Sequence, residues 1–209
     1  ARFSLPVRGE RQPVVVGFGP AGMFAARTLA RAGYAPVVLE RGDDVDARHA
    51  AIERFWRTGL LDVRSNVQFG EGGAGTFSDG KLTTRIGDPL VREVLEALVA
   101  AGAPEEILYL HQPHVGTDLL RGIVKNIREE ILRLGGVVRF AAQVTDVELE
   151  RGALRALIVN GEERVPTDAA FFAIGHSARD TYEMLLARGL FMEAKPFAVG
   201  VRAEHPQNF

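Results

Sequence analysis

The sequence predicts an α/β fold with a parallel central sheet, and two observations support this. Near the N-terminus, short β-branched runs at residues 13–16 and 36–40 flank a segment of helical periodicity at 20–32. This is the order of a parallel β-α-β unit. Further along, short strand patterns are joined by Arg-Gly and Asn-Gly turns, at residues 144–150, 154–159 and 163–166. Such a series is typical of an antiparallel three-stranded meander.

The composition excludes several classes of protein. The chain has 209 residues, of which 46% are hydrophobic and 25% charged, as in ordinary globular proteins. A net charge of -2 gives no electrostatic reason to expect nucleic acid or an anionic membrane as a partner. Because cysteine is absent, redox chemistry requires a bound cofactor or partner. We find no apolar run of the ~20 residues that span a bilayer and no signal-peptide core, and we expect a cytoplasmic location and a small-molecule substrate.

Periodicity predicts the remaining elements. Helical patterns occur at residues 45–59, 88–101, 118–134 and 178–188. The first of these helices should bury Ile52, Phe55 and Trp56, and the third carries an apolar stripe from Leu119 to Leu134. Apolar runs predict strands at residues 137–140, 169–174 (a buried strand) and 197–202. Residues 70–80 form a glycine-rich loop, and residues 104–116 are expected to be irregular.

The pattern GFGPAG lies between the first strand and its helix. Alone, Gly-x-Gly-x-x-Gly is weak evidence, but in this position it is the fingerprint of a dinucleotide-binding β-α-β unit. Gly17 allows the tight turn, Gly19 lets the backbone approach a pyrophosphate, and Gly22 lets helix and strand pack closely. Pro20 suits the first helical turn, where free N–H groups, including that of Ala21, attract phosphate.

Glu40 ends the second strand, near the ~20-residue distance from the glycines at which an acid is expected to bind the ribose. The alternative is a glycine-rich turn in an unrelated α/β protein, with Glu40 merely solvated. The agreement of strand, glycines, helix, second strand and acid favours the dinucleotide. A plain NAD domain continues with its third parallel strand after one crossover. Here that strand is delayed to residues 137–140 and the meander follows it, which by fold analogy favours FAD.

The second glycine-rich segment, residues 70–80, lets backbone N–H groups surround an anion or approach a flat ring. We expect Gly72 and Gly73 to lie against the pyrophosphate or the isoalloxazine, with Lys81 near the flavin. A cation there would stabilise the reduced, anionic flavin. The alternative is a surface loop without ligand contact.

Three stretches carry a resemblance to a known family: NVQFGEGGAGTFSDGKL at 66–82, KNIREEI at 125–131 and AIGHSARD at 173–180. With the glycine motif and Glu40-Arg41-Gly42, the chain resembles the bacterial uncharacterised FAD-dependent dehydrogenases, also called NAD(FAD)-utilising dehydrogenases. They belong to the glutathione-reductase-type flavoprotein superfamily. The resemblance implies a Rossmann-like FAD/NAD(P)-binding domain whose crossover is the three-stranded meander, followed by the start of a second, substrate domain.

The resemblance also implies site residues. Gly17, Gly19 and Gly22 would hold the pyrophosphate and Glu40 the adenosine ribose. The backbone of Val144 would read the adenine, and Gly175 would end the strand under the cofactor. Members of the superfamily have a late Gly-Asp motif that binds FAD. Nothing after Gly175 matches it, so we expect the motif beyond Phe209 or an incomplete site.

Other candidate side chains give weaker signals. The histidines, at positions 49, 111, 114, 176 and 205, form no paired helical metal motif. His176 either lies near the cofactor or is structural. Arg41 and Arg48 either reach phosphate or adenine, or are solvated or salt-bridged. We find no general base, so the catalytic residue stays unassigned.

The sequence therefore supports an FAD-dependent oxidoreductase whose flavin is reduced by a substrate or by NAD(P)H. The alternatives are a non-catalytic dinucleotide-binding module and an NAD(P)-only dehydrogenase. We expect an interrupted FAD-binding domain at residues 1–87 and 117–189, an inserted helical and irregular segment at 88–116, and the start of the substrate domain at 190–209.

Overall fold

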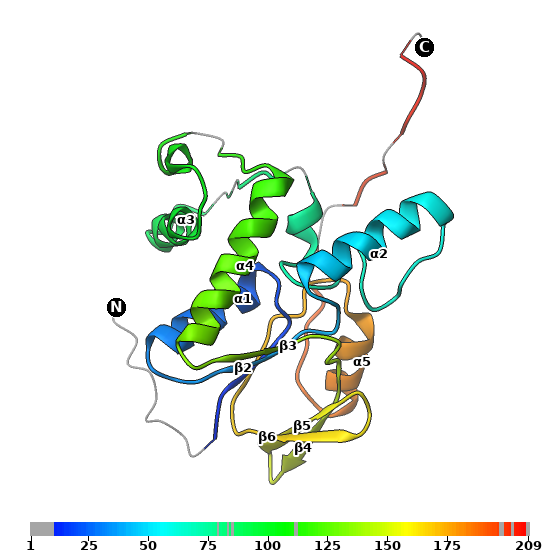
Figure 1. Cartoon of the computed structure of the whole chain (residues 1–209). Helices are drawn as coiled ribbons and strands as arrows, with labels where there is room; N and C mark the ends of the chain where they lie inside the picture. The colour runs from blue at the N-terminus through cyan, green and yellow to red at the C-terminus, as the bar shows by residue number, and fades with distance from the viewer. Residues whose placement is uncertain are drawn as a thin grey trace.

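The computed structural model describes residues 11–78, 80–82, 84, 86–110, 113–196, 199–201 and 203–207. Its centre is a four-stranded parallel sheet in the order β3-β2-β1-β7 (Figure 1). The strands are β1 (Val14–Val16), β2 (Val37–Leu39), β3 (Val137–Arg139) and β7 (Ala170–Phe172). The delayed strand β3 pairs in parallel with β2, and β7 pairs in parallel with β1. The interrupted parallel sheet expected from the sequence is therefore confirmed.

Helices α1 (Pro20–Arg31) and α4 (Thr117–Arg133) pack together on one face of this sheet (Figure 1). The helix α3 (Leu90–Ala100) and the 3₁₀ turn η2 (Glu105–Leu108) contribute Leu98 and Ile107 to the same apolar core. The remaining helical elements are α2 (Val45–Thr58), η1 (Ala74–Phe77) and α5 (Arg179–Ala187). No helix in the described part of the chain has the length and apolar character needed to cross a membrane.

The antiparallel meander forms a second sheet, of β4 (Val144–Glu150), β5 (Ala153–Val159) and β6 (Glu163–Pro166). Both of its turns place two consecutive residues at positive φ: Arg151 and Gly152 at 52° and 79°, and Asn160 and Gly161 at 53° and 83°. These values are typical of type I′ turns, which match the twist of a hairpin and which Asn-Gly favours.

Strand β1, in the middle of the central sheet, is buried on both faces. Val15 packs in the core formed with α1 and α4, whereas Val14 and Val16 pack in the core formed with the meander and α5. A strand enclosed on both sides is uniformly apolar rather than alternating, which explains the run of three valines in β1. The result is a three-layer arrangement of helices, parallel sheet and meander.

Several expectations about burial are wrong. Trp56 is 66% exposed and Phe55 only half-buried, because just the first half of α2 packs against the rest of the fold. Leu119 and Leu134 are also exposed, at the two ends of the stripe on α4. Strand β7 is not buried on both faces, since Phe171 is 46% exposed.

Two expectations concern residues outside or near the edge of the described ranges. Of the predicted strand at 197–202, residues 199–201 are described; they form no strand, and Val199 and Val201 are largely exposed. Residues 197, 198 and 202 lie outside the described residues, as does His111. The segment 104–116 is less irregular than expected, since it contains η2 and a β-bridge between His114 and Lys81.

Candidate functional site

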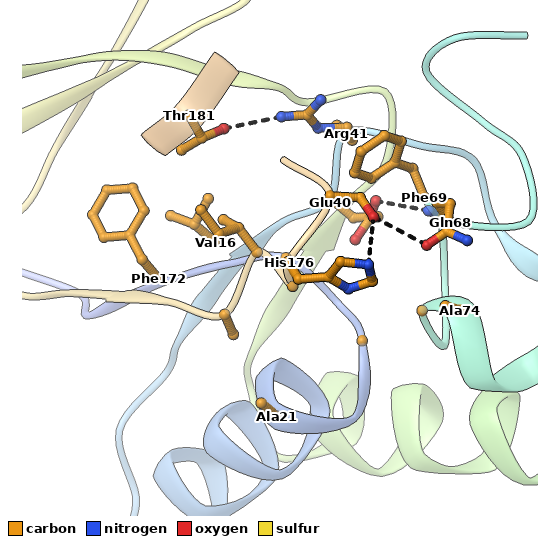
Figure 2. A pocket seen from close by; sticks show the side chains of 18 of the residues that line it. Val16, Ala21, Glu40, Arg41, Gln68, Phe69, Ala74, Phe172, His176 and Thr181 are labelled. Atoms are coloured by element: carbon orange, nitrogen blue, oxygen red, sulfur yellow. Dashed lines mark hydrogen bonds between the residues drawn. The ribbon is translucent and has the colours of Figure 1, made fainter. Parts of the chain in front are cut away.

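A cavity of about 400 Å³ lies at the carboxyl ends of three parallel strands (Figure 2). Its wall includes the last residue of each strand and the residue that follows it. These are Val16 and Gly17 at the end of β1, Leu39 and Glu40 at the end of β2, and Phe172 and Ala173 at the end of β7. The first turn of α1 and the second glycine-rich segment complete the wall. Ligands of open α/β sheets bind in the crevice outside the carboxyl ends of the strands, so this cavity is the candidate site.

The three glycines of the first motif have different local surroundings. Gly17 has φ 96°, and a Cβ on it would lie 2.5 Å from the carbonyl oxygen of Ala173. A Cβ on Gly22 would lie 1.9 Å from the carbonyl oxygen of Gly17. A Cβ on Gly19 would meet only Gly73, at an ordinary 3.5 Å. Gly17 and Gly22 are therefore needed for packing, whereas Gly19 keeps the cavity wall free of a side chain.

The N-terminus of α1 opens on this cavity without a capping group. Gly19 is the N-cap and Pro20 starts the helix, and among the described residues no side chain caps it and its first turn has no acidic residue. By contrast, Asp44 caps α2 and Glu71 accepts a further hydrogen bond from the N–H of Val45. The first N–H groups of a helix have no intrahelical acceptor, and the helix dipole adds partial positive charge. The uncapped end of α1 is thus suited to a phosphate.

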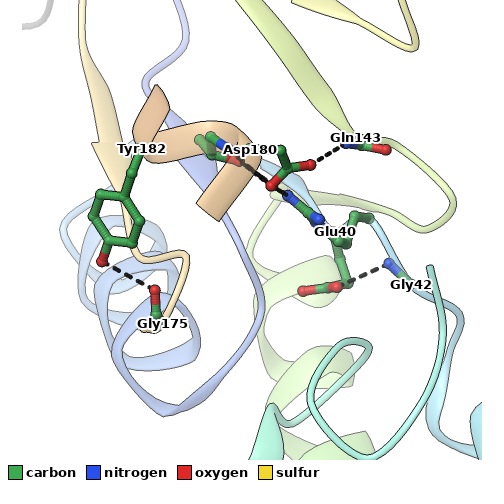
Figure 3. Close-up of polar contacts among 8 residues, drawn as sticks. Glu40, Gly42, Gln143, Gly175, Asp180 and Tyr182 are labelled. Carbon is green, nitrogen blue, oxygen red and sulfur yellow. Dashed lines mark hydrogen bonds and ion pairs between the residues drawn. The ribbon is translucent and has the colours of Figure 1, made fainter. Parts of the chain in front are cut away.

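Glu40 lies at the centre of the site with only 4% of its surface exposed. Its Oε2 accepts a hydrogen bond from the N–H of Phe18 at 2.7 Å, and its Oε1 accepts from Gly42 at 2.9 Å and Gly70 at 3.0 Å. Figure 3 shows the bond from Gly42. A carboxylate has about four lone-pair positions, so roughly one is left for a ligand hydroxyl. Sequence reasoning identified Glu40 as a ligand acceptor but missed its three protein donors.

Arg41 forms part of the wall rather than a solvated surface charge. Its guanidinium donates to Asp180 at 2.8 Å. It also donates to Thr181 at 2.9 Å and lies 4.5 Å from the centre of the Phe69 ring (Figure 2). Asp180 also accepts from the side chain of Gln143 at 2.8 Å (Figure 3). Burial tends to raise the pKa of Asp180, but the hydrogen bond and charge of Arg41 outweigh it and hold this pKa below its ordinary value.

The second glycine-rich segment packs directly on the first. The N–H of Gly72 donates to the carbonyl of Phe18 at 2.8 Å. A Cβ on Gly73 would come within 2.8 Å of the Cα of Gly19, and a Cβ on Gly42 within 2.6 Å of the Cα of Gly70. Gly73, Ala74 and Gly75 line the cavity opposite α1. The two glycine-rich segments therefore share one cavity, and their close approach depends on the missing side chains.

The structure brings most of the expected site residues together. The residues that line the cavity are Gly17, Gly19, Pro20, Ala21, Glu40, Arg41, Gly73, Val144 and Gly175. Gly22 and Gly72 do not line it, and a Cβ on Gly72 would lie 2.0 Å from the side-chain oxygen of Thr76. Lys81 does not line it either; it is exposed and forms the bridge to His114.

Other lining residues were not expected from the sequence. Gln68 and Phe69 belong to the stretch 66–82 that carries the family resemblance, but no role was expected for them. Thr181 and Tyr182 belong to no motif, and only the meeting of distant segments places them here. Tyr182 donates to the carbonyl of Gly175 at 3.0 Å. His176 lines the cavity, and its Nε2 lies 3.3 Å from the hydroxyl of Ser177, which donates to Gln68.

The cavity wall combines polar and apolar groups. The polar groups include the glycine backbone, Glu40 and the N-terminus of α1. The apolar groups are the side chains of Val16, Leu39, Ala142, Val144, Phe172 and Leu185. Such a cavity suits a ligand with an anionic part and a flat apolar part. In the described part of the chain, no group of three or more His, Asp or Glu side chains could hold a metal.

Comparisons with known proteins agree with the fold. No protein-family model matches the chain. A protein of Clostridium beijerinckii that bears the name "Uncharacterized protein" is 60% identical over 198 residues, which are 95% of this chain and 37% of the relative. The digeranylgeranylglycerophospholipid reductase of Haloferax volcanii is 31% identical over 166 residues, which are 79% of this chain and 35% of the relative. The chain thus spans little more than a third of these two relatives.

Among solved structures, THI4 of Thermovibrio ammonificans is similar with a TM-score of 0.53 at 18% identity. The match covers 86% of this chain and 62% of that protein. The parallel sheet with its separate meander is a Rossmann-like α/β fold.

Proposed function

We propose that this chain is the dinucleotide-binding part of an FAD-dependent oxidoreductase that acts on a small-molecule substrate. One observation carries the proposal: the uncapped N-terminus of α1, the glycine cradle and the carboxylate of Glu40 face one cavity. The glycine cradle is the part of the cavity wall at Gly19 and Gly73, which have no side chains; a Cβ on Gly73 would lie 2.8 Å from the Cα of Gly19. The residues present therefore fit the adenosine diphosphate part of such a cofactor.

The polar and apolar groups of the cavity wall would bind different parts of the cofactor. The N–H groups at the start of α1 would hold the pyrophosphate, and Gly19 and Gly73 would let it approach the backbone. Glu40 would accept from a ribose hydroxyl through its remaining lone pair. The adenine would lie against apolar side chains of the wall, beside Val144 and Leu185. The bound flavin would supply hydride or electron transfer, which the protein side chains lack.

FAD is preferred to NAD(P) alone because of the meander that separates β3 from β7 and covers one face of the sheet. The likeness to a reductase at 31% identity supports redox chemistry for the longer protein. The motif resemblance supports membership of the FAD-dependent dehydrogenase family described above. NAD(P)H as the electron donor, and a substrate domain that follows residue 189, belong to the same proposal.

The test is FAD binding by the purified full-length protein. We expect absorption bands near ~370 and ~450 nm and a flavin that NAD(P)H or a substrate reduces. Gly19→Ala should fold, because its Cβ makes only an ordinary contact of 3.5 Å. It should nevertheless weaken FAD binding by roughly tenfold, or 1.4 kcal/mol. The control is Gly122→Ala on the exposed surface of α4, which should bind FAD as the wild type does.

Three outcomes would contradict the proposal. A protein that binds NADH but takes up no FAD on reconstitution is an NAD(P)-only dehydrogenase. A protein whose bound flavin no reductant or substrate reduces is a binding module without turnover. Unchanged FAD affinity in Gly19→Ala would show that the cofactor lies elsewhere.

A further inference from the structure

The fully buried side chain of Arg48 lies behind the candidate site, and it does not line the cavity. Its Nε donates to the carbonyl of Asn66 at 2.8 Å. Its Nη1 donates to the carbonyls of Glu71 at 2.7 Å and Gly73 at 2.8 Å, with that of Gly70 at 3.4 Å. One guanidinium from α2 thus contacts four backbone carbonyls between residues 66 and 73.

Such burial of an arginine is unusual. Arginine is almost never fully buried unless it is paired, and within the described part of the chain Arg48 makes no salt bridge. Burial lowers the pKa of Arg48 to about 10, although the carboxylates of Glu40 and Glu71 act in the opposite direction. The desolvation cost is offset mainly by backbone carbonyls, so the benefit of this residue lies in the conformation of that backbone.

The same segment is held from its other side by its amides. The N–H of Gly70 donates to Glu40, that of Glu71 to the carbonyl of Asp43, and that of Gly72 to the carbonyl of Phe18. Carbonyls bound to Arg48 and amides bound to the ends of β1 and β2 leave the segment little freedom. Its far end is Gly73, which packs against Gly19 in the wall of the cavity.

Neighbouring groups hold the guanidinium in place. It lies 4.8 Å from the centre of the Phe77 ring, and His49 stacks on the same ring at 5.9 Å. Gly70 has φ 118°, and a Cβ there would lie 2.5 Å from Cδ of Arg48. The glycine at position 70 is therefore needed for the arginine side chain to pass.

We propose that Arg48 is the positioning residue of the second glycine-rich segment, and that it sets the wall Gly73–Gly75 of the dinucleotide site without touching the ligand. The proposal rests on the proposed function for its ligand. The clamp, by which we mean the hydrogen bonds from Arg48 to the carbonyls of segment 66–73, is a property of the protein alone. Arginine suits this role because its planar fork places two separate donors, Nε at the carbonyl of Asn66 and Nη1 at those of Glu71 and Gly73, whereas lysine has one donor nitrogen.

The experiment compares Arg48→Met, Arg48→Lys and the control Arg57→Met, on the exposed end of α2, in the full-length protein. Hydrogen exchange of amides 70–73 is measured without ligand, and ADP and FAD affinity by calorimetry. In Arg48→Met we expect these amides to exchange about tenfold faster and both affinities to fall about tenfold, because charged hydrogen bonds are lost. Arg48→Lys should recover only part of both effects, and Arg57→Met should match the wild type.

If Arg48→Met does not fold, Gly70→Ala takes its place, because its Cβ displaces the arginine. Its matched control is Gly59→Ala, which also has positive φ, 73°, but has nothing within 4 Å of the added Cβ. Gly70→Ala should loosen amides 70–73 and Gly59→Ala should not.

Wild-type exchange at amides 70–73 in Arg48→Met, or equal exchange in Gly70→Ala and Gly59→Ala, would overturn the proposed clamp. Full recovery by lysine would overturn the argument from the fork of donors. Failure of the wild type to bind either ADP or FAD would instead refute the proposed function, because the exchange measurement needs no ligand.

Discussion

Substitution of Glu40 tests the central polar contact of the site. This carboxylate is 4% exposed and accepts from three backbone N–H groups, those of Phe18, Gly42 and Gly70. Oε2 accepts a hydrogen bond from Phe18 alone, whereas Oε1 accepts from both Gly42 and Gly70. Glutamine and alanine therefore remove different numbers of these acceptors, and the two variants should differ in stability.

The expected losses follow from the number of donors left without a partner. Each buried donor that loses its acceptor costs about 1–3 kcal/mol. Glu40→Ala leaves all three unpaired, and we expect a loss of about 3–9 kcal/mol in the free energy of unfolding. Glu40→Gln can keep Oε1 for Gly42 and Gly70, but its amide group then turns N–H toward the N–H of Phe18. One donor is lost, and we expect about 1–3 kcal/mol.

Urea unfolding of the ligand-free proteins, followed by circular dichroism, measures both losses. The control is Glu53→Gln, whose side chain is 63% exposed in the wild type and which should change stability by less than about 0.5 kcal/mol. Thermal midpoints should fall in the same order, by about 2–4 °C per kcal/mol for a chain of this size. If Glu40→Gln is as stable as the wild type, or as unstable as Glu40→Ala, the three N–H groups do not depend on this carboxylate as argued.

Two further predictions concern packing and pH. Gly22→Ala places a Cβ 1.9 Å from a backbone oxygen, so urea unfolding should show a loss of about 3 kcal/mol; the open position Gly122→Ala should instead gain about 0.5–1 kcal/mol, and equal stabilities would contradict the close packing. Burial raises the pKa of Glu71 above its ordinary 4.5, although the N–H of Val45 and the charge of Arg128 oppose this. Its contribution to stability is therefore present below the unfolded pKa and lost as pH rises through the folded pKa. Glu71→Gln should accordingly gain stability relative to the wild type between about pH 4.5 and 7, and a constant difference across that range would refute the raised pKa.

Local signals in the chain were sufficient for most of the fold. The strands and helices lie within a few residues of their expected bounds, since β-branched runs, helical periods and glycine turns act over short distances. The exposed Trp56 and Phe171 were not predictable in this way. Periodicity shows which face of an element is apolar, but not how far a neighbouring element extends over that face.

The glycine motif, Glu40 and their order along the chain were sufficient to identify residues that the structure brings to one cavity. The roles of the polar groups around it came from contacts between distant segments. Glu40 accepts a hydrogen bond from the N–H of Gly70, which lies 30 residues further along the chain. Arg48 donates to the carbonyl of Gly73, which lies 25 residues further along. A buried arginine and a solvated one look alike in a sequence, because the carbonyls that bind Arg48 have no side-chain identity. Local motifs thus identify residues of the candidate site, whereas packing of the two glycine-rich segments determines how its protein donors and acceptors are arranged.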